Sequence, residues 1–276
     1  MSIYICPTPI GNLEDITLRV LRVLREVDCI AAEDTRRTRK LINHYQIHTP
    51  LVSYHEHNKE IKGDHILAMC MEGKDIALVS DAGTPGISDP GWELIRDAIE
   101  AGIEVICLPG PTALISALLL SGFQTASFIF DGFLPRKKSD RRKHLEELVN
   151  EGRTIIFYEA PHRLIGTLSD ILEVIGERRI CIVRELTKIH EEVFRGIVSQ
   201  AVKRFSMDPV RGEIVILLEG APKPPDEEII IQDADILQRV NDSMKNGMST
   251  RDAIKEVAQH FNISRRHVYN LYHENN

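Results

Sequence analysis

Residues 76–91 read IALVSDAGTPGISDPG, a short apolar run that leads directly into a loop rich in glycine and proline. The run Ile76–Ser80 has the length and composition of a buried β-strand. The twelve residues from Ser80 to Gly91 contain three glycines and two prolines. Glycine lets the backbone approach a ligand closely, and proline fixes the turn. We therefore expect a buried strand that ends in a rigid loop.

The same alternation of apolar runs and helical patterns continues on both sides of this stretch. Leu18, Leu21, Leu24 and Val27 repeat every three residues within Thr17–Val27, which predicts a helix with one apolar stripe. Strands that alternate with helices form a mostly parallel sheet with helices on both faces, so we expect the α/β class. The expected strands of this first half are Ile3–Cys6, Cys29–Glu33, Leu51–Tyr54, Ile76–Ser80 and Val105–Leu108.

A second alternating series follows, and its last strands are joined by connections short enough to indicate an antiparallel part. We expect one α/β domain in residues 1–121 and a second in residues 122–220. The strands expected in the second series are Phe128–Phe130, Thr154–Tyr158, Ile180–Arg184, Val193–Ile197 and Ile214–Leu218.

The last part of the chain, residues 221–276, differs in character. Residues 221–228 read APKPPDEE and are typical of a linker. A capping box at Ser249–Asp252 predicts the start of a helix, and residues 262–264 (NIS) would end it, with Ser264 capping a second helix over Arg265–His273. This spacing indicates a helix–turn–helix-like extension, which could bind nucleic acid or only pack against the main body.

Composition narrows the class of protein. The chain has 276 residues, 43% of them apolar and 27% charged, with a formal net charge of −7. These values exclude a disordered or fibrous chain, and the acidic balance excludes a protein that coats nucleic acid unselectively. We expect neither a signal peptide nor a membrane span, and hence a cytoplasmic protein. Five cysteines without a C-x-x-C pair are expected to be buried free thiols: Cys6, Cys29, Cys70, Cys107 and Cys181.

Three unusual loops follow expected strands, at residues 7–12 (PTPIGN), 80–91 and 108–113 (LPGPTA). Because the carboxyl ends of parallel strands meet at one edge of a sheet, these loops predict a ligand site, although each could be an ordinary tight turn. No phosphate-binding glycine motif occurs, and Gly86–Gly91 has the wrong spacing for a nucleophile elbow. His55 and His57 have no third partner, so we expect no metal.

Five motifs along the chain resemble the tetrapyrrole methylase superfamily: PTPIGNLEDIT (7–17), SDAGTPGISDPG (80–91), LPGPTA (108–113), FYEAPHR (157–163) and RELTKIHEE (184–192). The resemblance covers the whole chain and is strongest to the branch that methylates ribosomal RNA. Corrin and porphyrin methylases usually carry different first and second turns, so residues 9–12 and 81–83 count against a tetrapyrrole substrate.

The resemblance implies S-adenosylmethionine bound in a cleft between the two α/β domains. It also implies a 2′-O-methyltransferase of a decoding-region cytidine in 16S rRNA, acting on the small ribosomal subunit as a homodimer. Asp81 could meet a positive group of the donor, and backbone amides after it the carboxylate. The residues carried over as cofactor-binding are Pro9, Ser80, Asp81, Ala82, Gly83, Thr84, Ile87, Thr112, Ala113 and Tyr158.

Methyl transfer to a ribose hydroxyl benefits from a base or from a cation that stabilises the developing alkoxide. Lys188 and Glu185 are our candidates near the hydroxyl, and Arg184, His162 and Arg163 are the candidates to hold phosphate or ribose. An internal salt-bridge network is the competing interpretation of this cluster.

Two basic tracts interrupt the acidic chain and suit phosphate contacts, although such runs are often only solvated faces. Residues 136–143 hold six cations and one carboxylate, and residues 36–40 (RRTRK) form the other tract. A corrin or porphyrin methylase and a ligand-sensing DNA-binding regulator are the alternative functions. The candidate RNA-binding residues are Arg36, Arg37, Arg39, Arg136, Lys137, Lys138, Arg141, Arg142, Arg163, Arg265 and Arg266.

Overall fold

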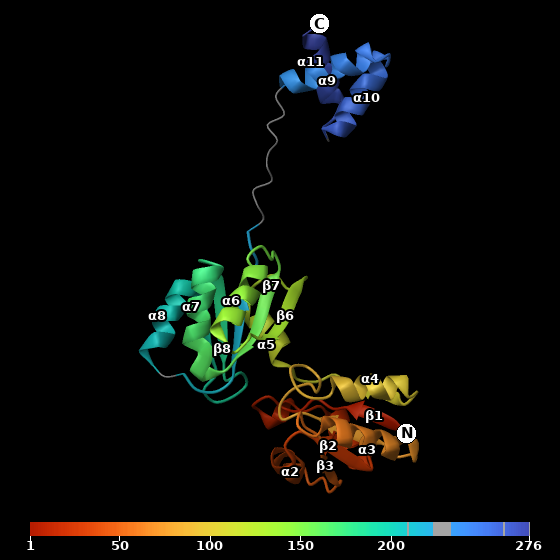
Figure 1. Cartoon of the computed structure of the whole chain (residues 1–276), viewed down its shortest axis with the longest axis vertical. Coiled ribbons are helices and arrows are strands. Elements are labelled where there is room, and N and C mark those ends of the chain that lie inside the picture. Colours follow the sequence, from red (N-terminus) through yellow and green to blue (C-terminus); the bar gives the residue numbers. More distant parts are fainter. Residues whose placement is uncertain (209, 223–232, 262, 276) are drawn as a thin grey trace. The chain divides into compact units, whose positions relative to one another are not determined.

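The computed structural model describes residues 1–208, 210–222, 233–261 and 263–275. Two compact units account for the chain, Met1–Ala221 and Pro222–Asn276 (Figure 1). Most of the expected linker, residues 223–228, and Asn262 lie outside the described residues. The division of the first unit into domains at residue 121 stays a prediction.

The first half of the larger unit contains a five-stranded sheet in the order β3-β2-β4-β1-β5, with every neighbouring pair parallel. All five expected strands are present, with small shifts at their ends. β4 is buried along its whole length, as the opening stretch of sequence predicts. The strands are β1 Ser2–Ile5, β2 Cys29–Ala32, β3 Leu51–Ser53, β4 Ile76–Val79 and β5 Glu104–Cys107.

Helices cover both faces of this sheet because its strands are apolar on both sides. Alternate β4 residues face opposite cores: Ala77 packs with helices α1 and α2, and Leu78 packs with α3 and α4. Figure 1 shows α2 and α4 on opposite sides of the strands. The helical segments of this half are η1 Leu13–Asp15, α1 Leu18–Glu26, α2 Thr35–His44, α3 Lys59–Met71 and α4 Trp92–Glu100.

The stripe predicted for α1 is wrong at its first residue. Thr17 caps the helix through its hydroxyl, as the expected start requires. Leu18 is 85% exposed, however, and the buried face is formed by Val20, Val23 and Leu24. A repeat of three residues drifts around a helix of 3.6 residues per turn, so its members do not all stay on one face.

The second sheet has the order β6-β7-β10-β8-β9, and only the β6–β7 pair is parallel. The expected antiparallel part is confirmed. Its strands are β6 Phe128–Phe133, β7 Thr154–Glu159, β8 Arg179–Arg184, β9 Glu192–Ile197 and β10 Ile214–Leu218. Its helical segments are α5 Ala113–Ser121, α6 Lys138–Glu147, η2 Pro161–Arg163, α7 Leu164–Val174 and α8 Val198–Met207.

The loop that follows β1 joins the two halves of this unit. Ile10 is buried against α5 and the inner face of the second sheet. Gly11 lies so close to the turn after β8 that a Cβ there would be 2.5 Å from Lys188 Cγ and 2.8 Å from the Leu186 carbonyl oxygen. Only a residue without a side chain permits this contact, which brings the first loop and the β8–β9 turn together.

One cysteine differs from expectation. Cys6, Cys29, Cys70 and Cys181 are buried free thiols, but Cys107 is exposed. β5 is an edge strand of the first sheet, and its end residues, Glu104 and Cys107, are both exposed. The interpretation of all five as buried was therefore wrong for Cys107.

The described residues of the smaller unit form three helices, α9 Asp233–Lys245, α10 Thr250–His260 and α11 Arg265–Glu274, around a core of their own. Ser249 and Ser264 accept hydrogen bonds from the N–H groups of Asp252 and His267, so both predicted helix caps are confirmed. Within the described parts of both units, we find no helix of the length and apolar character that a bilayer crossing needs.

The close packing of Gly11 predicts a stability effect. We expect Gly11→Ala to lower the free energy of unfolding by about 1–3 kcal/mol, because the added methyl group overpacks the contact with the β8–β9 turn. Gly63→Ala in α3 is the matched control: its Cβ would lie 3.9 Å from Tyr54 and should stabilise the helix by about 0.5–1 kcal/mol. Urea unfolding measures both, and equal effects would contradict the proposed packing.

Candidate cofactor pocket

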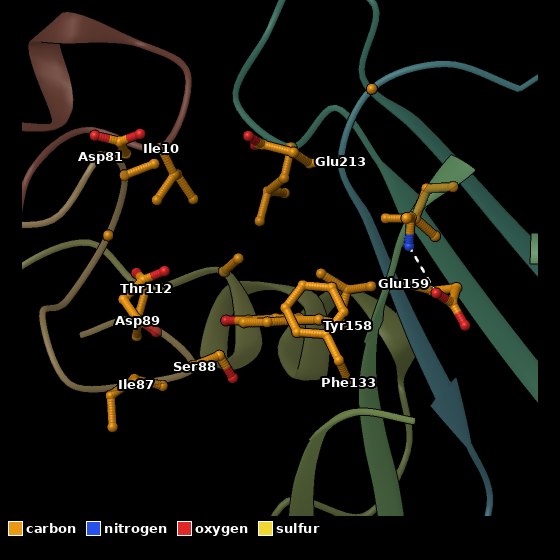
Figure 2. A pocket seen from close by; sticks show the side chains of 18 of the residues that line it. Ile10, Asp81, Ile87, Ser88, Asp89, Thr112, Phe133, Tyr158, Glu159 and Glu213 are labelled. Carbon is orange, nitrogen blue, oxygen red and sulfur yellow. Dashed lines mark hydrogen bonds between the residues drawn. The ribbon is translucent and has the colours of Figure 1, made fainter. Parts of the chain in front are cut away.

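The three glycine- and proline-rich loops meet at one edge of the first sheet and line a cavity of about 400 Å³. This volume is within the range of small-molecule sites, about 300–1,000 Å³. The opposite wall comes from β6, β7 and the start of β10 (Figure 2). Of the predicted cofactor residues, these line the cavity: Asp81, Ala82, Gly83, Thr84, Ile87, Thr112, Ala113 and Tyr158.

Backbone hydrogen bonds hold the loops against one another. Thr8 and Gly83 exchange two N–H···O bonds of 2.9 Å, which tie the first loop to the second. The Thr84 hydroxyl donates to the Pro111 carbonyl at 3.2 Å and ties the second loop to the third. The Ser80 hydroxyl donates to the Gly83 carbonyl within its own loop. Ser80 and Pro9 line a neighbouring hollow of about 220 Å³ and not the cavity itself.

Three carboxylates, those of Glu33, Asp81 and Asp89, line the same side of the cavity. Burial, together with the charges of Glu33 and Asp81, raises the pKa of Asp89 to about 7. Burial and the Asp81 charge also raise the pKa of Glu33. This excess of negative charge in a partly buried site favours the binding of a cationic ligand.

The facing wall is aromatic. Figure 2 shows Tyr158 and Phe133 across the cavity from Asp89. The Tyr158 ring packs edge-to-face with Phe130 and Phe133, at centroid distances of 4.9 and 5.7 Å. Burial raises the pKa of Tyr158, so its hydroxyl stays protonated. Acidic groups on one side and rings on the other suit S-adenosylmethionine, which combines a sulfonium and an ammonium with an adenine.

The candidate catalytic residues lie beside the cavity and do not line it. Lys188 Nζ is 2.8 Å from Glu185 Oε1 and 3.1 Å from Glu213 Oε2, and only Glu213 lines the cavity. Burial alone would lower the pKa of Lys188, but the two carboxylates raise it, so the side chain stays a cation. Burial alone would raise the pKa of Glu185. Hydrogen bonds from Lys188 and from the backbone N–H of Glu213 outweigh this effect and lower the pKa.

The turn that carries these residues has an uncommon backbone. Glu185 and Thr187 have positive φ values of 53° and 67°, a conformation that costs energy for residues other than glycine. Gly212 packs directly against the Glu185 side chain, where a Cβ would collide with it. Strain of this kind persists where surrounding contacts impose it, and here it holds Glu185 and Lys188 beside the cavity wall.

Arg184 and His162 are directed elsewhere. Arg184 pairs with Glu192 at 2.9 Å and lines a separate hollow of about 180 Å³ with Arg204 and Arg211. His162 is exposed on η2 and does not line the cavity.

The basic tract of residues 136–143 rests on a buried carboxylate. Asp170 is 1% exposed, and its Oδ2 accepts from Nε of Arg141 at 2.8 Å. Arg141 is itself only 7% exposed, so its guanidinium is held inside the protein. Lys138 and Arg142 approach Asp170 Oδ1 at 3.7 and 3.9 Å and keep more exposed side chains. The buried Asp170 therefore anchors the surface that carries the exposed cations of the tract.

The other candidate RNA-binding arginines occupy several environments. Arg163 lies against the buried Glu159 at 3.2 Å and donates to the Leu134 carbonyl. Arg37 lines the cavity and pairs with Asp81 at 3.2 Å. Arg36 pairs with Asp34, and Arg36 and Arg39 line a hollow of about 320 Å³ on α2. The remaining ones are exposed: Arg136 and Lys137 at α6, and Arg265 and Arg266 on α11.

Several cavity residues were not among the predicted ones. Asp89 lies inside the quoted loop 80–91, and its negative charge, like that of Asp81, was a usable signal. Glu33 ends an expected strand and carries the same sign of charge as Asp81, which was a usable signal. Ile10 and Ser88 belong to the first and second loops. The others come from the wall whose position the second sheet determines: Phe133, Glu159, Ala160, Pro161, Val183, Leu186, Gly212, Glu213, Ile214 and Val215. Among the described residues there is no group of side chains that could hold a metal ion.

Solved structures with the same fold are methyltransferases. A cobalt precorrin-4 methyltransferase matches with a TM-score of 0.58 at 18% identity, covering 79% of this chain and 94% of that one. A uroporphyrin-III-C-methyltransferase from Thermus thermophilus matches with a TM-score of 0.54 at 19% identity, covering 78% and 93%. At such low identity the likeness establishes the fold alone, and it confirms the predicted α/β architecture.

Curated relatives are much more similar in sequence. Proteins named ribosomal RNA small subunit methyltransferase I are 48% identical in Halalkalibacterium halodurans, over 99% of this chain and 95% of the relative, and 47% identical in Bacillus subtilis, over 98% and 94%. A namesake from Thermotoga maritima is 53% identical over 79% of this chain and 98% of its own length. The model of the tetrapyrrole (corrin/porphyrin) methylases matches residues 2–202. This chain therefore belongs to the tetrapyrrole methylase family, as its motifs predicted.

Proposed function

We propose that the protein is an S-adenosylmethionine-dependent rRNA methyltransferase, which methylates the ribose 2′-hydroxyl of a decoding-region cytidine in the small-subunit rRNA. Family membership and the names of relatives 38–53% identical support methyl transfer to small-subunit rRNA. The observation that carries the proposal is the cavity itself, where Glu33, Asp81 and Asp89 face an aromatic wall. A homodimer is a further prediction from the resemblance, and a cytoplasmic location is a further prediction from the sequence.

The donor would be held by groups whose chemistry matches its parts. Asp81, Asp89 and Glu33 would meet its positive groups, and the loop amides after Asp81 its carboxylate. Ile10, Ile87 and Tyr158 would enclose the adenosine. When bound, S-adenosylmethionine supplies a methyl group on a cationic sulfur. The partly apolar cavity favours a transfer that removes this charge, because less hydration of the charge has to be replaced.

Lys188 would act on the acceptor side through electrostatics. Its raised pKa keeps it protonated at neutral pH, so it is not a general base. It holds Glu213 at 3.1 Å, and Glu213 lines the cavity where the acceptor would enter. From behind the cavity wall the Lys188 cation would position the Glu213 carboxylate and offset its negative charge, so that charge developing on a nearby ribose oxygen is opposed less strongly.

RNA would be held by exposed cations around the cavity. The best-supported group is Lys137, which caps α6, with Lys138 and Arg142 on α6. Asp170 pairs with Lys138 and Arg142. Arg141 and Arg163 would act by supporting this surface, since their guanidinium groups are engaged inside the protein. Arg265 and Arg266 in the smaller unit would add a second contact with rRNA.

The direct test is methyl transfer from tritiated S-adenosylmethionine to small ribosomal subunits from cells without this enzyme. We expect label in 2′-O-methylcytidine of the small-subunit rRNA after nuclease digestion. Label in uroporphyrinogen III and not in rRNA would favour a corrin or porphyrin methylase, and ligand retention with duplex DNA but no turnover would favour a regulator. Lys188→Met should lower kcat by about 10²-fold with donor affinity unchanged, whereas Lys203→Met on α8 should have no effect.

Donor binding should depend on pH through Asp89. Its pKa of about 7 means that it is mostly protonated at pH 6 and mostly ionised at pH 8. A cation binds the ionised form better, so the association constant should rise with pH, by at most about tenfold per unit, and level off above pH 7. Titration calorimetry with S-adenosylmethionine between pH 5.5 and 8.5 measures this. Asp89→Asn should bind more weakly at pH 8 and lose the slope; a retained slope would assign the titration to another group.

Neutralising the exposed cations of α6 should weaken RNA binding. We expect the triple variant Lys137→Gln, Lys138→Gln, Arg142→Gln to reduce the slope of log K against log salt by about 2–3, because each lost phosphate contact removes about 0.7–0.9. Donor affinity should stay unchanged. The matched control replaces Arg19, Arg22 and Arg25 of α1 by glutamine. Equal salt slopes for the two triple variants would refute the assignment of this surface.

A further inference from the structure

We propose that Arg37 couples the two ligands of this enzyme, by pairing with Asp81 or with an rRNA phosphate according to whether the donor occupies Asp81. Arg37 is thus a positioning residue that makes donor and RNA strengthen each other's binding. The inference rests on the proposed function, because its second ligand is a phosphate of rRNA.

Arg37 stands between two hollows. Its side chain lines the 400 Å³ cavity and also the 220 Å³ hollow formed with Thr38 and Lys40. Although its guanidinium is 3.2 Å from Asp81 Oδ2, the side chain is 64% exposed. An exposed ion pair of this kind contributes about 0–1 kcal/mol, so a competing cation displaces it at small cost.

The two carboxylate oxygens of Asp81 have different partners. Its Oδ1 accepts from the N–H of Asp34 at 3.0 Å, and this bond fixes the carboxylate at the start of α2. Its Oδ2 is the atom that faces Arg37. A positive group of the donor at Asp81 would therefore compete with Arg37 for the same oxygen, and like-charge repulsion would favour the departure of the guanidinium.

The other side of Arg37 is already suited to phosphate. Lys40 lines both the 220 Å³ hollow and the adjacent 320 Å³ hollow, which Arg39 and Asn43 share. Arg36 is engaged by Asp34, at 2.9 Å. A guanidinium released from Asp81 would thus join Lys40, three residues further along α2, at the 220 Å³ hollow that both side chains line, and two cations at one surface favour a phosphate group.

Thermodynamic linkage makes the coupling reciprocal. If the donor raises RNA affinity by a given factor, RNA raises donor affinity by the same factor, and typical couplings are about 5–150-fold. The enzyme would in this way hold RNA firmly only when a methyl donor is present.

The test is a binding cycle on the full chain with sinefungin, an unreactive cationic analogue of the donor, and small ribosomal subunits. Subunit affinity is measured with and without sinefungin for the wild type, for Arg37→Gln, and for Arg22→Gln on α1 as the matched control. We expect sinefungin to tighten subunit binding at least about 5-fold in the wild type and in Arg22→Gln, and to have no effect on it in Arg37→Gln. Sinefungin alone should bind Arg37→Gln as tightly as the wild type or more tightly.

Each contrary result has a distinct meaning. Coupling that persists in Arg37→Gln would overturn the proposal. Weaker sinefungin binding by Arg37→Gln would also overturn it, because Arg37 would then be a direct ligand of the donor. Wild type that binds no subunits in either condition would refute the proposed function, while the sinefungin measurement would still decide whether Arg37 competes for Asp81.

Discussion

The pair of backbone hydrogen bonds between Thr8 and Gly83 is the constraint on which the site depends. It fastens the loop after β1 to the loop after β4, at the edge where both strands end. The same first loop carries Ile10 into the core beneath the second sheet and Gly11 against the β8–β9 turn. One short segment therefore determines both the floor of the cavity and the distance to its opposite wall.

Acidic and basic side chains occupy different places around the cavity, in an arrangement that suits two ligands. Carboxylates are concentrated inside the cavity, where burial raises the pKa of Asp89 and Glu33. Cations lie at its rim and on α2 and α6, several of them anchored by acidic partners such as Asp170. A small cationic donor and a polyanionic acceptor would thus be attracted to different parts of one surface, and Arg37 is the residue that belongs to both.

Much of the fold follows from local pattern. All ten expected strands are present, because apolar runs of three to five residues bounded by glycine, proline or charge have few other stable structures. Local pattern was less informative about orientation. Leu18 and Cys107 are exposed, since the face of α1 and the edge position of β5 depend on which elements pack against them. Arg141 stands in a basic tract, yet a buried aspartate 29 residues away determines where its guanidinium lies.

The sequence by itself determined the α/β class, the three rigid loops, the caps of the last two helices and the family. These features depend on residue types within a few positions of one another. A motif such as SDAGTPGISDPG can therefore be identified without knowing which other segments it contacts. Only the tertiary structure decided which charges face the cavity. Glu213 lines it, Lys188 lies one contact behind, and Arg184 is directed to another hollow. The reason is that the burial and the ion pairing of a side chain depend on how the two sheets pack together. Residues that are close in sequence can therefore lie in different environments.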